Sequence, residues 1–151
     1  MSDTDRIEKR VVLRAPRSRV WRAVSDAQEF GKWFRVELEG AFAEKRAIRG
    51  RITQPGYEHL TMEVIVERIE PERLFSFRWH PYAVDPAVDY SSEPATLVEI
   101  RLEEEAGDTL VTVVESGFEA LPPSRRDEAF RMNDGGWTAQ MGNLGRHVAA
   151  E

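Results

Sequence analysis

The sequence predicts an α+β domain in which a curved antiparallel sheet grips a long C-terminal helix. Two observations support this prediction. Apolar and polar residues alternate in short segments between residues 6 and 116, and tight turns separate these segments. A helical spacing of apolar residues takes over after residue 122. Helices that gather on one side of an antiparallel sheet define the α+β class, so the order of elements already restricts the architecture.

The N-terminal part is expected to form one strand followed by two short helices. Residues 6–14 alternate between apolar and charged side chains, as a half-buried strand does. Apolar residues at helical spacing follow directly and predict the first helix. Asp26 and Glu29 have the spacing of a capping box, which predicts a second helix that ends near Trp33 and Phe34.

Alternation returns from about residue 41 and predicts six or so further strands, among them 60–67, 75–80, 95–104 and 109–116. Residues 81–94 show no period and carry three prolines and two tyrosines. A loop of this length in a small domain is usually functional or mobile. We therefore expect a lid or a partner surface there, and a homodimer is one form the partner could take.

The final helix has one apolar face, formed by Phe130, Trp137, Met141, Leu144 and Val148. Four glycines interrupt this helix, and each costs about 1 kcal/mol relative to alanine. Two explanations stay open at this point. Either the helix kinks at Gly135-Gly136, or bulk is excluded where the helix faces the sheet.

Composition limits the functions that the chain can have. Its 151 residues suit a single domain, 1–151, and its net charge of −6 disfavours nucleic acid as a partner. Apolar runs are too short for membrane insertion, and the polar N-terminus does not resemble a signal peptide, so a cytoplasmic location is expected. No cysteine is present, the three histidines lack metal-ligand spacing and no dinucleotide fingerprint occurs. We therefore expect neither a metal nor another cofactor.

An aromatic face on one central strand, formed by Phe75, Phe77 and Trp79, is the main candidate for ligand contact. Such a face is either a cavity wall or plain core, because pockets and cores use the same residues. We expect an enclosed pocket between the sheet and the last helix. The candidate ligand contacts are Trp33, Phe34, Met62, Val64, Phe75, Phe77, Trp79, His80, Glu115, Phe118, Trp137 and Met141. No catalytic residue is assigned.

Glu115 is the most informative polar residue, because both faces of its strand are apolar. If Val111 and Val113 point inward, Glu115 points inward too and could serve as an acid, a base or a ligand anchor. The alternative is a rim residue paired with Arg78 or another arginine. The rim is favoured at this stage, since charged residues are rarely fully buried.

Several short motifs in this order resemble the START-like helix-grip (SRPBCC) superfamily, and more narrowly the branch named after the activator of Hsp90 ATPase homologue. They are Ala15-Pro16-x-x-x-Val20-Trp21, Trp33-Phe34, Phe77-Arg78-Trp79, Glu115-Ser116-Gly117-Phe118 and Gly136-Trp137. The resemblance implies one START-like domain that binds a small hydrophobic or aromatic molecule. Alternatives are an enzyme of the cyclase or aromatase type and a chaperone-associated interaction protein. The chain shows no dense cluster of acid–base residues, which favours binding over catalysis.

Overall fold

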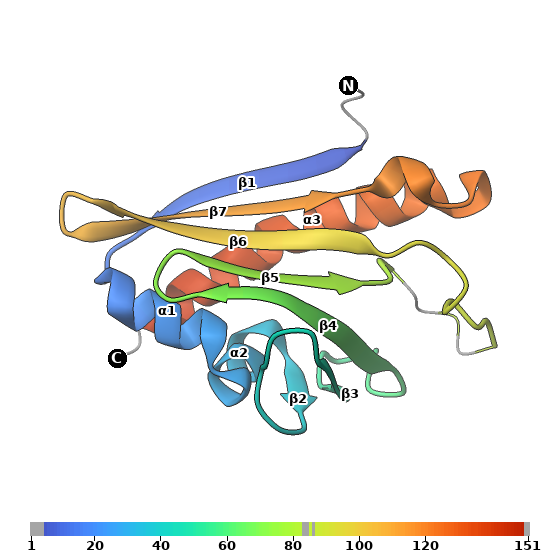
Figure 1. Cartoon of the computed structure of the whole chain (residues 1–151), viewed down its shortest axis with the longest axis horizontal. Helices are drawn as coiled ribbons and strands as arrows, with labels where there is room; N and C mark the ends of the chain where they lie inside the picture. Colours follow the sequence, from blue (N-terminus) through green and yellow to red (C-terminus); the bar gives the residue numbers. More distant parts are fainter. Residues whose placement is uncertain (1–4, 83–84, 86, 150–151) are drawn as a thin grey trace.

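The computed structural model describes residues 5–82, 85 and 87–149, and within them seven strands form one antiparallel sheet. The elements in chain order are β1 (Arg6–Leu13), α1 (Arg17–Ser25), α2 (Ala27–Phe34), β2 (Val36–Leu38), β3 (Ala47–Ile52), β4 (Thr61–Glu70), β5 (Leu74–Trp79), β6 (Thr96–Glu105), β7 (Asp108–Ser116), the 3₁₀ turn η1 (Phe118–Ala120) and α3 (Pro123–Ala149). The strand order is β1-β7-β6-β5-β4-β3-β2. Figure 1 shows α3 running behind the strands, with α1 and α2 at one end. The predicted helix-grip α+β fold is confirmed.

Alternation along the strands explains why one face of the sheet is apolar. Val64 and Val66 on β4 and Phe75 and Phe77 on β5 are all at most 1% exposed. They belong to the same core cluster as Leu144 of α3. Burial of each such side chain stabilises the fold by about 1.5–3 kcal/mol. A β-bulge lies on β4 where it pairs with β5, and bulges increase local twist and bend. The core therefore lies between a curved sheet and α3.

The junction of α1 and α2 bears out half of the predicted capping box. The side chain of Asp26 accepts hydrogen bonds from the backbone N–H groups of Gln28 and Glu29, both at 3.0 Å. Glu29 does not return a bond to Asp26. Its carboxylate instead accepts from Arg19 (2.9 Å), Arg22 (2.7 Å) and His147 of α3 (2.8 Å). Burial opposes ionisation of Glu29, but these donors outweigh it and hold its pKa at about 2.

The glycines of α3 have more than one explanation. α3 continues through Gly135 and Gly136 as one helix from Pro123 to Ala149. A Cβ on either glycine would meet nothing within 4 Å, so no packing among the described residues explains them. At Gly145 a Cβ would lie 3.3 Å from Leu13 Cδ2 of β1. Exclusion of bulk therefore applies at Gly145, where the helix faces the sheet.

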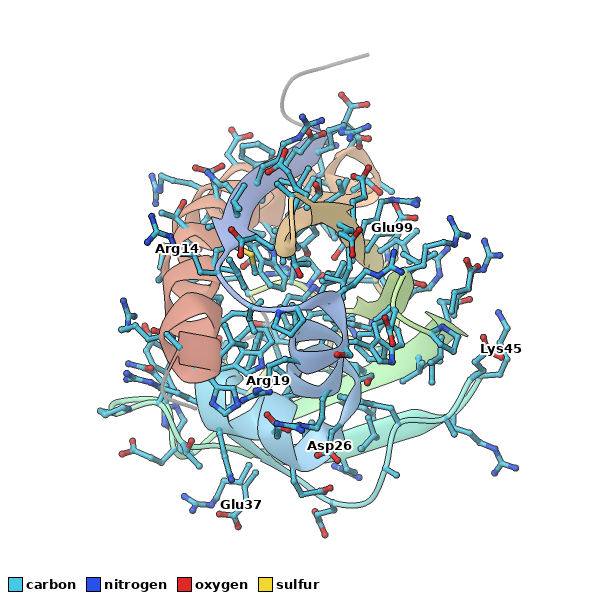
Figure 2. All side chains as sticks on the ribbon, turned by 90° about the vertical axis from the view of Figure 1, so that its left-hand side faces the viewer. Arg14, Arg19, Asp26, Glu37, Lys45 and Glu99 are labelled. Atoms are coloured by element: carbon cyan, nitrogen blue, oxygen red, sulfur yellow. The ribbon has the colours of Figure 1, made fainter. Side chains whose placement is uncertain are left out.

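The outer surface is strongly charged. Figure 2 shows Arg14, Glu37 and Lys45 projecting away from the body of the molecule, and all three are exposed. In the described part of the chain, none of the helices combines the length and the apolar character needed to cross a bilayer.

Candidate functional site

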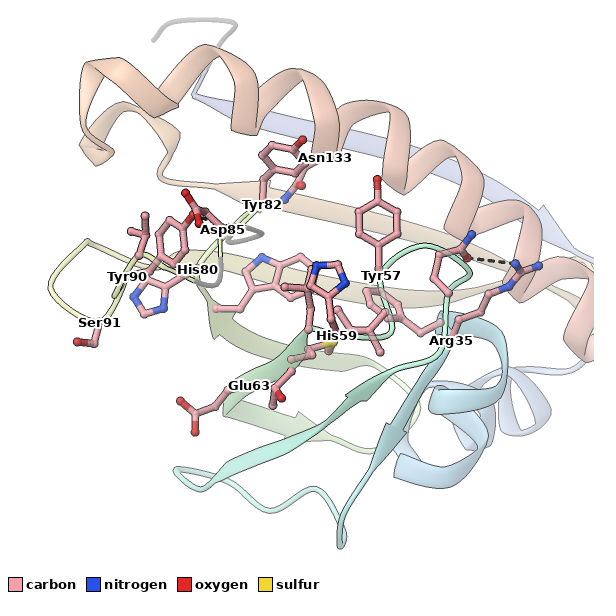
Figure 3. Close-up of a pocket in the computed structure, with 18 of the residues that line it drawn as sticks. Arg35, Tyr57, His59, Glu63, His80, Tyr82, Asp85, Tyr90, Ser91 and Asn133 are labelled. Atoms are coloured by element: carbon pink, nitrogen blue, oxygen red, sulfur yellow. Dashed lines mark hydrogen bonds between the residues drawn. The ribbon is translucent and has the colours of Figure 1, made fainter.

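A pocket of about 600 Å³ lies between the strands β3 to β5, the connection from β5 to β6, and α3. It is partly open to solvent, in contrast to the enclosed cavity expected from the sequence. Its apolar wall is formed by Phe34, Ile52, Leu60, Met62 and Trp79. Figure 3 shows the polar lining as well, with Arg35 toward one end and Tyr90 and Ser91 toward the other.

Two aromatic rings connect the pocket wall to the core. Phe34 and Trp79 are half-buried, and their ring centroids are 5.9 Å apart. Each ring also lies 5.9 Å from the ring of Trp137, which is only 2% exposed. Trp79 further contacts Phe77 edge-to-face at 5.3 Å. Phe34 and Trp79 therefore form an aromatic floor of the pocket, because both rings pack against aromatic rings of the core.

A buried carboxylate lies directly beneath that floor. Glu115 is fully buried, and its Oε2 accepts hydrogen bonds from Trp79 Nε1 at 2.8 Å and Thr96 Oγ1 at 2.6 Å. Its Oε1 accepts from Trp137 Nε1 at 2.8 Å and Asn133 Nδ2 at 3.0 Å. Strand register explains the meeting. Glu115 of β7 pairs with Val98 of β6, and Trp79 of β5 pairs with Thr96 of β6. Because Thr96 and Val98 are two residues apart on β6, the side chains of Trp79, Thr96 and Glu115 lie on the same face of the sheet.

The rim position favoured for Glu115 is wrong. Arg78 lies on the opposite face of β5 from Trp79, and its Nε donates to Glu67 at 3.2 Å. Glu115 has no arginine or lysine partner among the described residues. Four uncharged donors stabilise it instead, which satisfies a buried carboxylate without a cation. Val111 and Val113 are fully buried on the same face, so the inward alternative holds.

Four of the candidate ligand contacts line the pocket, namely Phe34, Met62, Trp79 and His80. The others lie behind it in the buried core: Trp33, Val64, Phe75, Phe77, Glu115, Phe118, Trp137 and Met141. The difference comes from packing across the sheet. Phe75 and Phe77, for example, contact Phe30 of α2 at centroid distances of 6.5 and 6.4 Å, and α2 thus covers them. Trp33 donates its Nε1 to the carbonyl of Ala23 at 2.9 Å instead of facing the pocket.

Sequence reasoning missed several polar pocket residues, including Arg35, Tyr57, Asn133 and Gln140. Asn133 had a usable signal, because it precedes Trp137 by four residues and so lies on the inner helix face. Its Nδ2 donates to Glu115, so Oδ1 is the atom of this amide that is able to accept a further hydrogen bond. Arg35 lies in a turn and Tyr57 in the connection from β3 to β4, where no periodicity marks the direction of a side chain.

Arg125 forms hydrogen bonds to the connection between β5 and β6, which lines the pocket. Arg125, in the first turns of α3, donates Nε and Nη2 to the carboxylate of Glu93 at 2.9–3.1 Å. Its Nη1 and Nη2 donate to the carbonyls of Tyr82 and Pro81, both at 3.0 Å. Its guanidinium carbon lies 4.6 Å from the centroid of the Tyr90 ring. Arg125 thus holds both ends of the connection, although the expected mobility of residues 81–94 stays a prediction. Residues 83, 84 and 86 lie outside the described residues.

The histidines are placed separately. His59 and His80 line the pocket, whereas His147 of α3 bonds to Glu29 of α2. The Nε2 of His80 lies 3.1 Å from the carbonyl oxygen of Glu93, which can only accept, so Nε2 donates. Across residues 5–82, 85 and 87–149, no group of three or more histidines and acids is placed to hold a metal ion.

The fold and its pocket define a helix-grip domain, and comparison with known proteins identifies the branch. The chain belongs to the family described as Activator of Hsp90 ATPase homolog 1-like protein, which it matches over residues 14–149. No curated protein matches the chain.

Solved structures share the fold at low sequence identity. DynU16, from the dynemicin biosynthetic locus, is 23% identical with a TM-score of 0.74, over 96% of this chain and 47% of DynU16. This chain therefore spans about half the length of DynU16. CalU16 from Micromonospora echinospora is 24% identical with a TM-score of 0.65, over 95% of this chain and 75% of that one. The Aha1 dimer from Colwellia psychrerythraea is 15% identical with a TM-score of 0.70, over 95% of each chain.

Proposed function

We propose that this protein binds a small hydrophobic or aromatic molecule in the pocket between the sheet and α3. The observation that carries the proposal is the orientation of Trp79. Its indole N–H is engaged by buried Glu115, and the residue lines a pocket of about 600 Å³. A ring held in this way offers its carbon surface, so an aromatic or acyl group is the complementary partner.

The pocket also has the size and chemistry of a small-molecule site. Ligand pockets usually measure about 300–1,000 Å³ and combine an apolar wall with a few placed polar groups. Phe34, Leu60 and Met62 extend the apolar wall beside Trp79, and Asn133 supplies a fixed polar group. A ligand that covers this wall removes apolar surface from water, which contributes about 25 cal/mol per Å² before the cost of association.

Binding is favoured over catalysis by the state of the acidic and basic groups. The oxygens of Glu115 are both occupied by donors, and the side chain is fully buried beneath Trp79. Nε2 of His80 is bonded to a backbone carbonyl. Glu115 therefore has no free oxygen with which to move a proton on a ligand, and only Nδ1 of His80 is left to accept one. DynU16 comes from a biosynthetic locus, which agrees with a small molecule as the ligand of this fold.

Partner binding and location extend the proposal. The Aha1 of Colwellia psychrerythraea forms a dimer, and a homodimer stays a prediction for this chain, which sedimentation equilibrium would test. A cytoplasmic location likewise stays a prediction.

Indole NMR signals give a direct test. Uniform ¹⁵N labelling yields one indole N–H signal for each of the four tryptophans, and Trp79→Phe identifies the signal of Trp79. Titration with naphthalene and indole should shift the Trp79 signal and leave that of Trp21, which lies on α1 outside the pocket, unchanged. If Trp21 and Trp79 respond equally, or if neither responds to any compound, the proposal is wrong.

A further inference from the structure

We infer that the pocket selects an amphipathic anion: an aromatic or acyl carboxylate whose acid group binds Arg35 while its apolar part covers Phe34 and Trp79. This inference rests on the proposed function and names the chemical class of the ligand. Three features carry it: the backbone of Arg35, the partners of its guanidinium, and the distribution of charge along the pocket.

The backbone of Arg35 holds the side chain at the pocket against conformational preference. Arg35 is the C-cap of α2 and is left-handed, with φ 69° and ψ 58°. Its N–H donates to Gly31 and its carbonyl accepts from Thr53, both at 2.9 Å. Glycine or asparagine takes this conformation with less strain than arginine. A strained residue that lines a pocket points to a role for its side chain.

The guanidinium of Arg35 is oriented but not neutralised. Its Nη1 donates to Gln54 Oε1 at 3.1 Å, and Gln54 also lines the pocket. No carboxylate pairs with Arg35 in the part of the chain that the structure describes. An arginine has five N–H donors in a planar fork that matches a carboxylate. The guanidinium of Arg35 is therefore held in the pocket and has further N–H groups that can donate to a ligand.

Charge along the pocket has a direction. Arg35 lies toward one end, whereas Asp85 and Tyr90 lie toward the other (Figure 3). Asp89, which directly precedes Tyr90 in the chain, also lines the pocket. Hydrogen bonds from the backbone and side chain of Ser91 lower the pKa of Asp89, so this group is ionised at neutral pH. An anionic ligand is repelled from the Asp89 end and attracted to Arg35. The apolar wall between the two ends then receives the rest of the molecule.

A matched pair of probes separates charge from hydrophobic binding. Calorimetric titrations compare 2-naphthylacetate with 2-naphthylacetamide, which differ in charge but share the ring. We expect wild type to bind the acid about tenfold more tightly than the amide, as charge-assisted hydrogen bonds allow. Arg35→Gln should remove this preference and leave the affinity for the amide unchanged. Arg14→Gln is the control, because Arg14 is exposed, lies outside the pocket and carries the same charge.

A folding control keeps the result interpretable. Arg35→Gly relieves the left-handed strain, so it should unfold at the same or a higher urea concentration than wild type while losing the preference for the acid. Equal binding of acid and amide by wild type would overturn the inference and leave the proposed function standing. Binding of neither probe would contradict the proposed function, and the inference would fall with it. An equal loss in Arg14→Gln and Arg35→Gln would show that net charge, not a site, selects the acid.

Discussion

Replacing Glu115 with glutamine tests how the pocket floor is held, because the amide keeps the shape of the carboxylate and changes its hydrogen bonding. In Glu115→Gln, an NH₂ group takes the place of one oxygen. At the Oε2 position it would face the indole N–H of Trp79, and at the Oε1 position it would face that of Trp137. In either orientation one indole N–H meets another donor and loses its acceptor.

The cost follows from the groups left unpaired. A buried donor without a partner costs about 1–3 kcal/mol, and the bonds that stay weaken because their acceptor is no longer charged. Removal of a buried charge returns part of its desolvation cost. We expect Glu115→Gln to lower the free energy of unfolding by about 2–4 kcal/mol, out of the roughly 5–15 kcal/mol typical of a domain. Glu115→Met should cost more, since Trp137 and Thr96 then both lose their acceptor inside the core.

Urea unfolding followed by circular dichroism measures these losses without relying on the fluorescence of the tryptophans involved. Glu99→Gln is the control, because it removes the same charge from the neighbouring strand and breaks one surface contact with Arg101 at 2.8 Å. Such surface pairs contribute about 0–1 kcal/mol. If Glu115→Gln were as stable as Glu99→Gln, the four donors would not be holding the floor and the reasoning would fail.

Three further perturbations test the pocket, an ion cluster and the β5–β6 connection. Trp79→Ala should lower the free energy of unfolding, measured in urea, by less than the about 3–5 kcal/mol expected for a buried tryptophan. It should also lower it by less than Trp137→Ala does. Both variants lose a hydrogen bond to Glu115, but only Trp79 borders an existing pocket. Glu29 has a pKa of about 2 against an ordinary 4.5, so its contribution is complete above about pH 4.5 and is lost as the pH falls toward 2. The stability gap between wild type and Glu29→Gln should therefore narrow in acid, and a constant gap would contradict the pKa. Arg125→Ala should speed amide hydrogen exchange at residues 88–93 and leave β7 unchanged, whereas equal exchange in both proteins would show that Arg125 does not hold the connection.

Local signals in the sequence predicted elements and faces well. The alternation of Phe75, Phe77 and Trp79 predicts one shared face, and all three belong to the apolar face that meets α2, α3 or the pocket. The cap at Asp26 follows from its spacing to the next helix. These features depend on neighbours within a few residues, because strand and helix periods are properties of the local backbone.

Contacts between distant segments escaped the same reasoning. Glu115 lies 36 residues from Trp79 and 22 from Trp137, and burial of its carboxylate becomes stable only when donors from β5, β6 and α3 converge on it. A general expectation that charges avoid the interior therefore gave the wrong position for Glu115. The direction of the Arg35 side chain could not be predicted from the sequence either, because a turn has no periodic pattern of apolar residues.

The division between core and pocket shows most clearly what the sequence determines and what only the tertiary structure determines. Composition and periodicity alone predict an α+β fold whose sheet has an aromatic face and is followed by a long C-terminal helix. Tertiary packing decides that α2 covers Phe77 and that Trp79, two residues further along the same strand, borders open space. Both positions satisfy the same pattern, because a ring in a pocket and a ring in a core are equally apolar. They differ only in whether another segment of the chain fills the volume beside them.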